Sequence, residues 1–375
     1  MEDKMTSRQR VLAAIEHKPV DRMPIDLGCH YSSGISAFAY YNLRKYLGMS
    51  TDNIKIADPM QFLAKVDEDI LEMFHIDCIN LHPGFENPVV YNPREDYRFV
   101  VEESLMPEKG EEGSWILKHD GLSARMLKGG YFFDGDWIDG FNFREEETLD
   151  KLAKEAERIY HETDYFTMLI GFGAFFSMDI EFMLKMIQDK DEIHAINKER
   201  LKNQISDAAK VIKKMGKHIQ AIAINSDLGT QNGPIVNPKL YEELCVPYIK
   251  EFCSFIHNES DLKVFMHSCG SIEPMIGPIA DAGVDILNPV QISANNMEPE
   301  KLKERYGDKI TFWGGGCDTQ NVLATATPDE VAQNVKYLSG ILKKDSGFVF
   351  NQVHNIMGDV PPENIIAMLE AAYEQ

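Results

Sequence analysis

Three residues with soft ligand atoms stand out by their type and spacing. His267 and Cys269 lie one residue apart in Val264-Phe-Met-His-Ser-Cys-Gly270, and Cys317 ends the later run Phe312-Trp-Gly-Gly-Gly-Cys317. Imidazole and thiolate are ligands that Zn²⁺ prefers, and a site with three protein ligands keeps a fourth position open for a reacting molecule. The spacing therefore predicts a catalytic zinc centre on His267, Cys269 and Cys317.

A structural zinc site would add a fourth Cys or His at close spacing, and the sequence contains no paired Cys-x-x-Cys motif. The alternative is that Cys269 and Cys317 are simply two of six free cysteines buried in strands, as unpaired cysteine often is. Cysteines spread this widely do not resemble a disulfide framework, so the thiols stay available as ligands.

The elements that must position these residues are short apolar runs that alternate with amphipathic helical stretches. The predicted strands are Met23–Leu27, Ile76–Leu81, Met168–Ile170, Ile219–Ile224, Lys263–Met266, Val284–Leu287, Ile310–Trp313 and Phe348–Phe350. Predicted helices include Thr6–Ile15, Asp179–Gln188, Lys190–Lys214, Pro238–His257 and Asp329–Leu342. Eight alternating units predict an α/β fold, a single (β/α)₈ TIM barrel with a parallel sheet.

One segment interrupts this alternation after the second predicted strand. Residues 87–143 are rich in Tyr, Gly and charge, and two runs of β-forming residues flank Lys109-Gly-Glu-Glu-Gly113. This pattern predicts an antiparallel β insertion that contains a hairpin. The sequence contains no repeat or linker, so residues 1–375 are expected to form one domain.

Polar residues follow most of the apolar runs, where the active sites of such barrels lie. The residues predicted to bind substrate are His30, His82, Asn225, Asp227, Asn351 and His354. Asp227 could also support a metal-bound histidine, because such histidines usually donate their second N–H to a carboxylate or carbonyl. The alternatives are that His30 and His82 are ordinary loop histidines and that Asp227 caps a loop.

Composition and charge exclude several classes of protein. The chain has 375 residues, 44% of them hydrophobic, and a formal net charge of −22, which opposes binding to nucleic acid or to anionic membranes. Its apolar runs are far shorter than the roughly 20 residues that span a bilayer. The N-terminal residues contain no apolar signal core, so we expect a cytoplasmic protein.

Four segments carry a resemblance to a known family: Arg8-Gln-Arg-Val-Leu-Ala-Ala-Ile-Glu-His-Lys-Pro-Val-Asp-Arg-Met-Pro24, His267-Ser-Cys-Gly270, Asp281-Ala-Gly-Val-Asp-Ile-Leu-Asn-Pro-Val-Gln291 and Phe348-Val-Phe-Asn-Gln-Val-His-Asn355. Together they resemble the uroporphyrinogen decarboxylase superfamily, which implies one (β/α)₈ barrel. Authentic decarboxylases of this superfamily have an arginine-rich segment after the first strand. The corresponding segment here, Leu27-Gly-Cys-His-Tyr-Ser-Ser-Gly-Ile35, has no arginine, which disfavours porphyrin decarboxylation.

Within the superfamily, the chain resembles the cobamide-dependent methyltransferases, whose zinc motif is His-x-Cys followed far downstream by Cys. His267, Cys269 and Cys317 match that motif. The resemblance implies a corrinoid (cobalamin) as methyl carrier. The Asp-x-His-x-x-Gly pattern of corrinoid-carrying domains is absent from the sequence, so a separate corrinoid protein is the expected partner.

The resemblance implies methyl transfer between a small-molecule donor and cobalt, and we favour a methoxylated donor such as a methoxylated aromatic compound. Aromatic residues that could enclose it are Trp115, Tyr131, Phe132, Phe133, Trp137, Phe172, Phe175 and Phe176, which could equally be packing residues. The alternatives are a methylcobamide:thiol methyltransferase of the coenzyme M type, a decarboxylase or lyase without metal, and a binding module without activity.

Overall fold

A computed structural model describes residues 5–375. Residues 1–4, which belong to the predicted domain 1–375, lie outside the described residues. Its centre is a six-stranded sheet with the strand order β14-β13-β12-β11-β10-β9, in which all neighbouring strands are parallel. The strands are β9 (Met168–Gly173), β10 (Ala221–Asn225), β11 (Lys263–His267), β12 (Ile286–Asn288), β13 (Thr311–Trp313) and β14 (Phe348–Val349). The chain therefore has the predicted α/β fold with a parallel sheet.

The pairing continues beyond both edges of this sheet. The Asp26 N–H donates to the Phe350 carbonyl (2.8 Å), the Asp77 N–H to the Ile25 carbonyl (2.8 Å) and the Ile79 N–H to the Phe166 carbonyl (2.9 Å). The first two predicted strands are nevertheless reduced to single parallel bridges at Ile25 and Cys78. Two causes are that Pro24 has no N–H to donate and that the Ile25 N–H bonds to the Asp77 carboxylate instead of a carbonyl.

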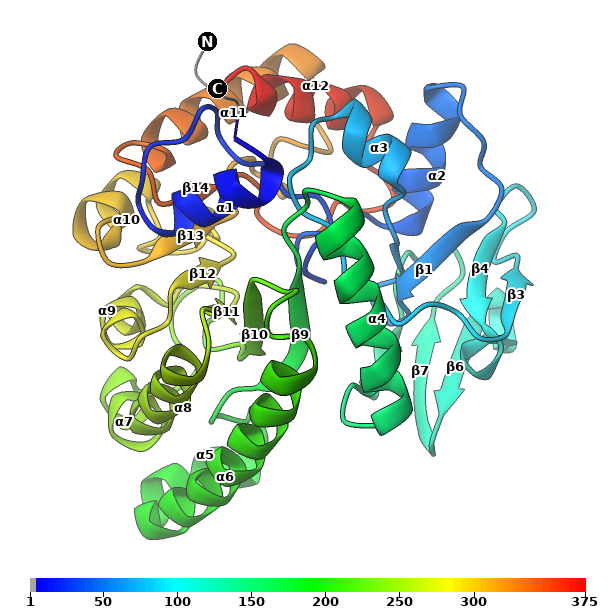
Figure 1. Cartoon of the computed structure of the whole chain (residues 1–375). Helices are drawn as coiled ribbons and strands as arrows, with labels where there is room; N and C mark the ends of the chain where they lie inside the picture. Colours follow the sequence, from blue (N-terminus) through cyan, green and yellow to red (C-terminus); the bar gives the residue numbers. More distant parts are fainter. Residues whose placement is uncertain (1–4) are drawn as a thin grey trace.

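Helices follow the strands and surround the sheet (Figure 1). They are α4 (Glu146–Glu162), α5 (Ile180–Gln188), α6 (Lys190–Met215), α7 (Pro238–Leu244), α8 (Val246–Glu259), α9 (Glu273–Asp281), α10 (Pro299–Tyr306), α11 (Pro328–Leu342) and α12 (Pro362–Tyr373). The predicted helix Pro238–His257 is two helices, because Pro247 at the start of α8 lacks the N–H that a continuous helix needs. Within residues 5–375, no helix is both long and apolar enough to cross a membrane.

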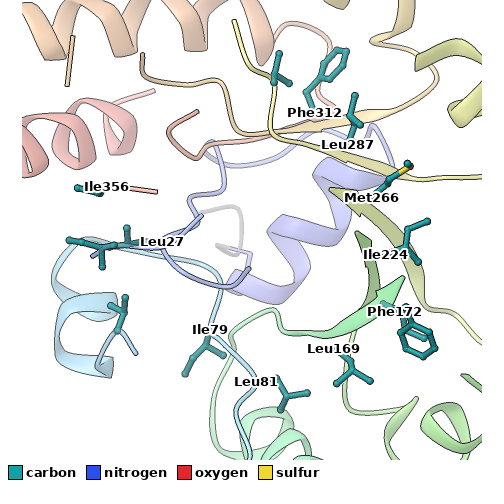
Figure 2. Close-up of a cluster of buried hydrophobic side chains, with 14 of the residues drawn as sticks. Leu27, Ile79, Leu81, Leu169, Phe172, Ile224, Met266, Leu287, Phe312 and Ile356 are labelled. Atoms are coloured by element: carbon teal, nitrogen blue, oxygen red, sulfur yellow. The ribbon is translucent and has the colours of Figure 1, made fainter. Parts of the chain in front are cut away.

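Both faces of the strands are buried, as expected for a parallel sheet covered by helices. Alternate side chains, such as Met168, Ala223 and Phe265, form one buried cluster with Trp313. The intervening side chains belong to a second, larger cluster, and Figure 2 shows Leu169, Ile224, Met266, Leu287 and Phe312 from successive strands of that set. Apart from an irregularity where β9 pairs with β10, this alternation fixes which side chain at each strand end can reach the site.

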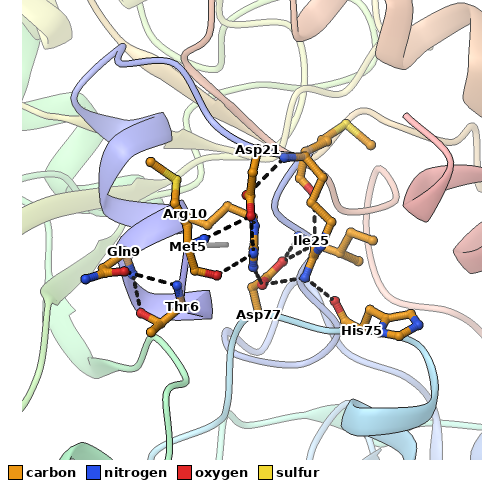
Figure 3. Close-up of polar contacts among 10 residues, drawn as sticks. Met5, Thr6, Gln9, Arg10, Asp21, Ile25, His75 and Asp77 are labelled. Carbon is orange, nitrogen blue, oxygen red and sulfur yellow. Dashed lines mark hydrogen bonds and ion pairs between the residues drawn. The ribbon is translucent and has the colours of Figure 1, made fainter. Parts of the chain in front are cut away.

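The N-terminal helix α1 (Ser7–Ile15) packs against the first of these clusters and begins at the predicted cap, Thr6, which forms a capping box with Gln9. The buried Asp77 carboxylate accepts hydrogen bonds from Arg10 (2.6 Å) and Arg22 (2.7 Å), and Arg10 also pairs with Asp21 (Figure 3). Breaking such a buried pair costs roughly 3–5 kcal/mol, so this network firmly attaches the N-terminal segment to the sheet.

Residues 54–135, here called the β-rich region, form two further sheets beside α4 (Figure 1). Their strands are β1 (Ile54–Asp58), β2 (Leu63–Ala64), β3 (Pro88–Tyr91), β4 (Phe99–Glu102), β5 (Glu108–Lys109), β6 (Trp115–His119), β7 (Leu122–Met126) and β8 (Asp134–Gly135). Short helices α2 (Ala37–Tyr46) and α3 (Glu68–Met73) and 3₁₀ turns at Glu103–Leu105 and Glu111–Gly113 complete the chain.

The predicted insertion differs from this region in two respects. β1 and β2 precede residue 87, so the region begins earlier than the sequence indicated. Most of its strand pairs are antiparallel, including β5 with β6 at the predicted hairpin, but β1 pairs with β4 in parallel. β1 was missed because Ile54-Lys-Ile-Ala-Asp58 is too short to distinguish a strand from a helix by periodicity.

Candidate metal centre

The carboxyl ends of three neighbouring strands bring polar side chains together. Asn225 on β10 is in register with His267 on β11, which is in register with Asn288 on β12. Asp227 and Cys269 follow two residues after the first two of these positions. The site therefore lies at the end of the sheet where the active sites of α/β proteins gather.

The hydrogen bonds of Asn288 fix which nitrogen of His267 carries a proton. The Asn288 amide Nδ2 donates to the Trp313 carbonyl (2.9 Å), so Oδ1 is the atom that faces His267 Nδ1 at 2.9 Å. An amide oxygen only accepts, and therefore Nδ1 of His267 is protonated. The other nitrogen, Nε2, is the one that a metal would bind in place of a proton, as in metal-bound histidines whose second N–H is held by a neighbouring oxygen.

His267 Nε2 faces two anionic groups. The Cys269 Sγ and the Asp227 Oδ1 each lie 3.4 Å from it, and the Cys269 N–H donates to the same Asp227 oxygen (3.2 Å). Burial by itself would lower the pKa of His267. The negative charges of Cys269 and Asp227 outweigh this effect and raise the pKa of His267 well above its ordinary value. Burial likewise disfavours the Cys269 thiolate, yet the charge of His267 lowers the pKa of that thiol to about 6. The pair therefore holds a thiolate near neutral pH, the form of cysteine that binds metals.

His354 offers a third possible ligand atom. One atom each of His267, Cys269 and His354 lie within 4.8 Å of one another, and the rings of His267 and His354 are 6.1 Å apart, edge to face. The predicted ligand Cys317 belongs to the large buried cluster and is not a member of this group within residues 5–375. Its carbonyl accepts from the Val353 N–H (3.0 Å), so the backbones of Cys317 and His354 approach the same place from adjoining segments.

His30 lies against the centre from the first predicted strand. Its ring stacks on His267 with centroids 5.4 Å apart and on Phe265 at 4.9 Å. Its Nε2 is 3.1 Å from the Asn225 Oδ1, and burial lowers the pKa of the imidazole well below its ordinary value, which keeps the ring neutral. His30, Asn225 and Asp227 therefore meet at the site, as predicted from their places in the sequence.

A close backbone contact sets the position of the Cys269 loop. Gly270 has φ +84°, and a Cβ there would lie 2.4 Å from the carbonyl carbon of Gly229, in the loop after Asp227. Only glycine accepts both the conformation and the contact. The two loops that carry Asp227 and Cys269 are thus held together by their backbones.

Two of the predicted substrate residues lie elsewhere. Asn351 is fully buried and its amide donates to the Asp26 and Ser33 carbonyls (3.4 and 3.3 Å), so it supports the chain around His30. His82 lines a separate cavity beside the β-rich region, together with Phe133 and Trp137. The other predicted aromatic residues, Trp115, Tyr131, Phe132, Phe172, Phe175 and Phe176, are not among the residues within 5–375 that line this cavity.

Sequence reasoning gave no role to Asn288 or Ser32. Ser32 Oγ donates to the Asn288 Oδ1 and lies 2.7 Å from His30 Nδ1, so the two residues link His30 to His267. Asn288 directly follows the predicted strand Val284–Leu287, and that position was the available signal. Ser32 lies in a loop, where nothing in the sequence indicates which direction its hydroxyl faces.

Comparison with known proteins connects this geometry to one family. The sequence profile of the family "Uroporphyrinogen decarboxylase (URO-D)" matches residues 174–375, just over half of the chain. That match includes β10 to β14 and the residues from Asn225 to His354.

Individual relatives match a shorter part. Uroporphyrinogen decarboxylase of Chlorobium phaeobacteroides is 30% identical over 141 residues, which are 36% of this chain and 37% of the relative. The enzyme of Psychromonas ingrahamii is 24% identical over 147 residues, 38% of this chain and 39% of the relative. The alignment thus spans less than two fifths of the length of these curated relatives.

One solved structure matches along nearly the full length. A methyltransferase from Methanosarcina mazei superposes with a TM-score of 0.60 over 99% of both chains, at 16% sequence identity. At this identity the likeness establishes a shared fold.

Proposed function

The chain belongs to the uroporphyrinogen decarboxylase family, and we propose that within it this protein is a zinc-dependent methyltransferase that moves a methyl group between a small-molecule donor and the cobalt of a corrinoid protein. The observation that carries this proposal is the pair His267–Cys269, in which a thiol of lowered pKa lies 3.4 Å from the ring nitrogen left as a ligand. The fold shared with a methyltransferase from Methanosarcina mazei is compatible with it.

The donor set fits zinc. Imidazole and thiolate are its usual ligands, and Asn288 orients His267 in the way that outer hydrogen bonds orient metal-bound histidines. Zinc, when bound, would supply Lewis acidity toward the heteroatom that carries or accepts the methyl group. Asp227 and Asn288 would keep the ligands oriented, while His30 and Asn225 form the wall beside them.

Two residues are candidates for the third ligand, and we propose that one of them completes the site. The family motif supports Cys317, whereas the distances among ligand atoms support His354. The backbone hydrogen bond from the Val353 N–H to the Cys317 carbonyl joins the segments that carry the two candidates. A single further ligand would leave the fourth position open for a reacting molecule.

A methoxylated compound is the donor that we propose, and a thiol acceptor of the coenzyme M type is the alternative direction of the same chemistry. Both directions need one open coordination position with uncharged, buried side chains beside it. His30 and Phe265 are such side chains. The two directions differ in the substrate that must reach the centre, so substrate assays distinguish them.

We also interpret the sheet as a closed (β/α)₈ barrel in one domain. Hydrogen bonds run from β14 through Ile25 and Asp77 to Phe166, directly before β9. This continuous series of hydrogen bonds supports the interpretation. The two short segments at Ile25 and Cys78 would close the six-stranded sheet into a barrel, which accounts for all eight predicted strands. The β-rich region would then be an excursion from the barrel.

The corrinoid protein needs a docking surface, and we propose the exposed face of α5 for it. Ile180 (73% exposed), Leu184 (49%) and Ile187 (69%) form one apolar stripe on this helix. α5 starts soon after β9 ends at Gly173, which is in register through Asn225 with His267. Exposed apolar stripes of this kind mark interaction sites.

Charge decides between a second copy of the chain and a different protein. Asp179 and Asp189 cap α5, Glu181 and Glu192 pair with Lys185 of that helix (3.2 and 2.6 Å), and the chain has a net charge of −22. Two copies would repel each other, whereas a corrinoid protein with a basic rim would be attracted.

Ile187→Asp should raise the KM for the corrinoid protein by about tenfold without changing transfer to free cobalamin. Leu122→Asp, on exposed β7, is the control, and an equal effect of both substitutions would contradict this docking site.

The names of the curated relatives favour a decarboxylase as the second candidate. Residues 27–35 contain no arginine, and the side chains bonded to His267 and Cys269 within residues 5–375 include neither arginine nor lysine. A substrate with many carboxylates would meet the Asp227 carboxylate, whose pKa is lowered to about 2 because His267 overcomes the effect of burial.

Zinc content and methyl transfer together test the proposal. We expect close to one zinc per chain in the wild type and little in Cys269→Ala, with the buried Cys253→Ala as the matched control. The wild type should then transfer methyl from 2-methoxyphenol, or from related donors, to Co(I) cobalamin, followed by the absorbance of the corrinoid. A protein that stays free of zinc after zinc is offered under reducing conditions would instead support the decarboxylase.

A further inference from the structure

A cavity of about 830 Å³ lies between the β-rich region, the segment around His82 and the start of α4. Its volume is within the range of small-molecule sites. Buried apolar side chains form much of its wall, among them Ile56, Val101, Leu117 and Phe133. Such a wall favours an apolar or aromatic ligand.

The lining of this cavity includes one buried histidine, His82, that among the described residues uses only one of its two ring nitrogens in a hydrogen bond. His82 is only 6% exposed, and its Nδ1 accepts the Gly84 N–H at 3.0 Å. A backbone N–H can only donate, so Nδ1 carries the lone pair and the proton of the neutral ring is on Nε2. Burial, aided by Lys65 and Lys55, lowers the pKa of His82 to about 3, and the ring is therefore neutral. Within residues 5–375, Nε2–H has no hydrogen-bond acceptor, and it is available to a ligand.

Two aromatic rings hold His82 in place. Phe85 stacks on it with ring centroids 4.8 Å apart, and Phe141 meets it edge to face at 5.5 Å. Both phenylalanines also line the cavity. The donor is thus fixed in direction, as a site that selects a hydrogen-bond acceptor requires.

The charges around the cavity disfavour anions. Glu103, Asp120, Asp139 and Glu145 are among its lining residues. Its two strongly basic residues are already paired, Lys151 with Glu86 and Arg144 with Asp207 (2.8 Å). A carboxylate ligand would therefore meet these acidic side chains in the lining, while Lys55 and Lys65 act on His82 from outside it.

The cavity is separate from the metal centre. Its lining includes none of His267, Cys269 and His354 among the described residues. It also draws on β1, β4, β6 and α4, whereas the metal centre draws on β10, β11 and β12.

We propose that this cavity is a second binding site, independent of the metal centre, for a neutral aromatic compound whose oxygen accepts a hydrogen bond from His82 Nε2. The apolar wall takes the ring, His82 selects the acceptor and the acidic residues reject anionic analogues. This proposal does not rest on methyl transfer or on zinc.

Benzamide is a suitable probe because it is neutral and aromatic and carries a carbonyl acceptor. Trp137 lines the cavity and is one of three tryptophans, so its fluorescence reports occupancy. We expect benzamide to quench the full-length protein saturably, benzoate to bind at least about tenfold more weakly, and the signal to vanish in Trp137→Phe.

Variants assign the binding to His82. His82→Phe keeps an aromatic ring but removes the donor, and should weaken benzamide binding about threefold to tenfold. His161→Phe, on the exposed face of α4 and outside the lining, and Cys269→Ser, in the metal centre, should bind as the wild type does. Absence of saturable quenching, or equal affinity in His82→Phe, would overturn the proposal. Loss of binding in Cys269→Ser would show that the cavity is part of the metal centre and would overturn its independence.

Discussion

Two buried histidines of this protein, His267 and His82, carry opposite electrostatic character. His267 faces the thiol of Cys269 and the carboxylate of Asp227, and its pKa is raised despite burial. His82 is buried to a similar degree beside Phe85 and two lysines, and its pKa is lowered to about 3. Burial alone would lower both values, so the neighbours decide.

The difference follows from the elements that hold the two residues. His267 ends a central strand whose neighbours, β10 and β12, present Asn225 and Asn288 in register. His82 follows a segment that pairs only at Cys78, and it faces the β-rich region. Regular strand ends assemble several polar groups at one point, whereas the irregular region encloses a cavity with a partly apolar wall, in which His82 is a buried donor.

The largest expected effect is the loss of zinc affinity when the third ligand is removed. This experiment tests the environment of His267 in the comparison. His354→Ala and Cys317→Ala should differ, because only one of these residues completes the site. The variant that lacks the ligand should lose at least about a hundredfold in zinc affinity, and the other should bind zinc as the wild type does. Competition with a chromogenic chelator measures both affinities.

The two other outcomes of this experiment each have a meaning. If both variants kept their zinc affinity, the site would not depend on a third side chain from this segment. If both lost it, four protein ligands would close the site, which contradicts a catalytic zinc with an open position.

Asn288 tests whether the orientation of His267 matters. Asn288→Ala removes the oxygen that holds Nδ1–H, and zinc affinity should fall by roughly tenfold to a hundredfold. Asn364→Ala is the matched control, because this asparagine is also buried and also donates to backbone carbonyls (2.9 and 2.8 Å), but within residues 5–375 forms no hydrogen bond with His267, Cys269 or His354. Zinc affinities that fall equally in both variants would point to a general loss of stability.

Sequence reasoning was most successful where strands are regular. The apolar runs identified the six strands of the parallel sheet, and reading the residue after each run placed His267, Asn225 and Asp227 together. Family membership also followed from the motifs, since the family profile covers residues 174–375. Register within a parallel sheet makes such inferences local, because neighbouring strand ends lie side by side.

It was less successful where a single side-chain direction decides. The sequence does not indicate that the sulfur of Cys317 is packed in the core or that His354 faces the ligand pair. The same holds for His82, whose partner is the Gly84 N–H of its own loop. Rotamers and loop geometry depend on tertiary packing, which periodicity does not encode.

The smallest expected effect concerns His82 and stability. Its folded pKa of about 3 lies below the value near 6.5 of the unfolded chain, so the unfolded state binds the extra proton first as the pH falls. The wild type should therefore lose about 2 kcal/mol of unfolding free energy through this group between pH 7 and pH 5. His82→Phe lacks that loss, so its stability relative to the wild type should rise by a similar amount over the same interval.

Urea unfolding at pH 7 and pH 5 measures this difference, and His119→Phe on the more exposed side of the cavity is the control. Any constant cost of His82→Phe, such as the lost bond to Gly84, cancels when the two pH values are compared. A pH-independent difference between wild type and His82→Phe would mean that His82 can be protonated in the folded protein. The contrast between the two buried histidines would then fail, and so would the neutral donor on which the second binding site depends.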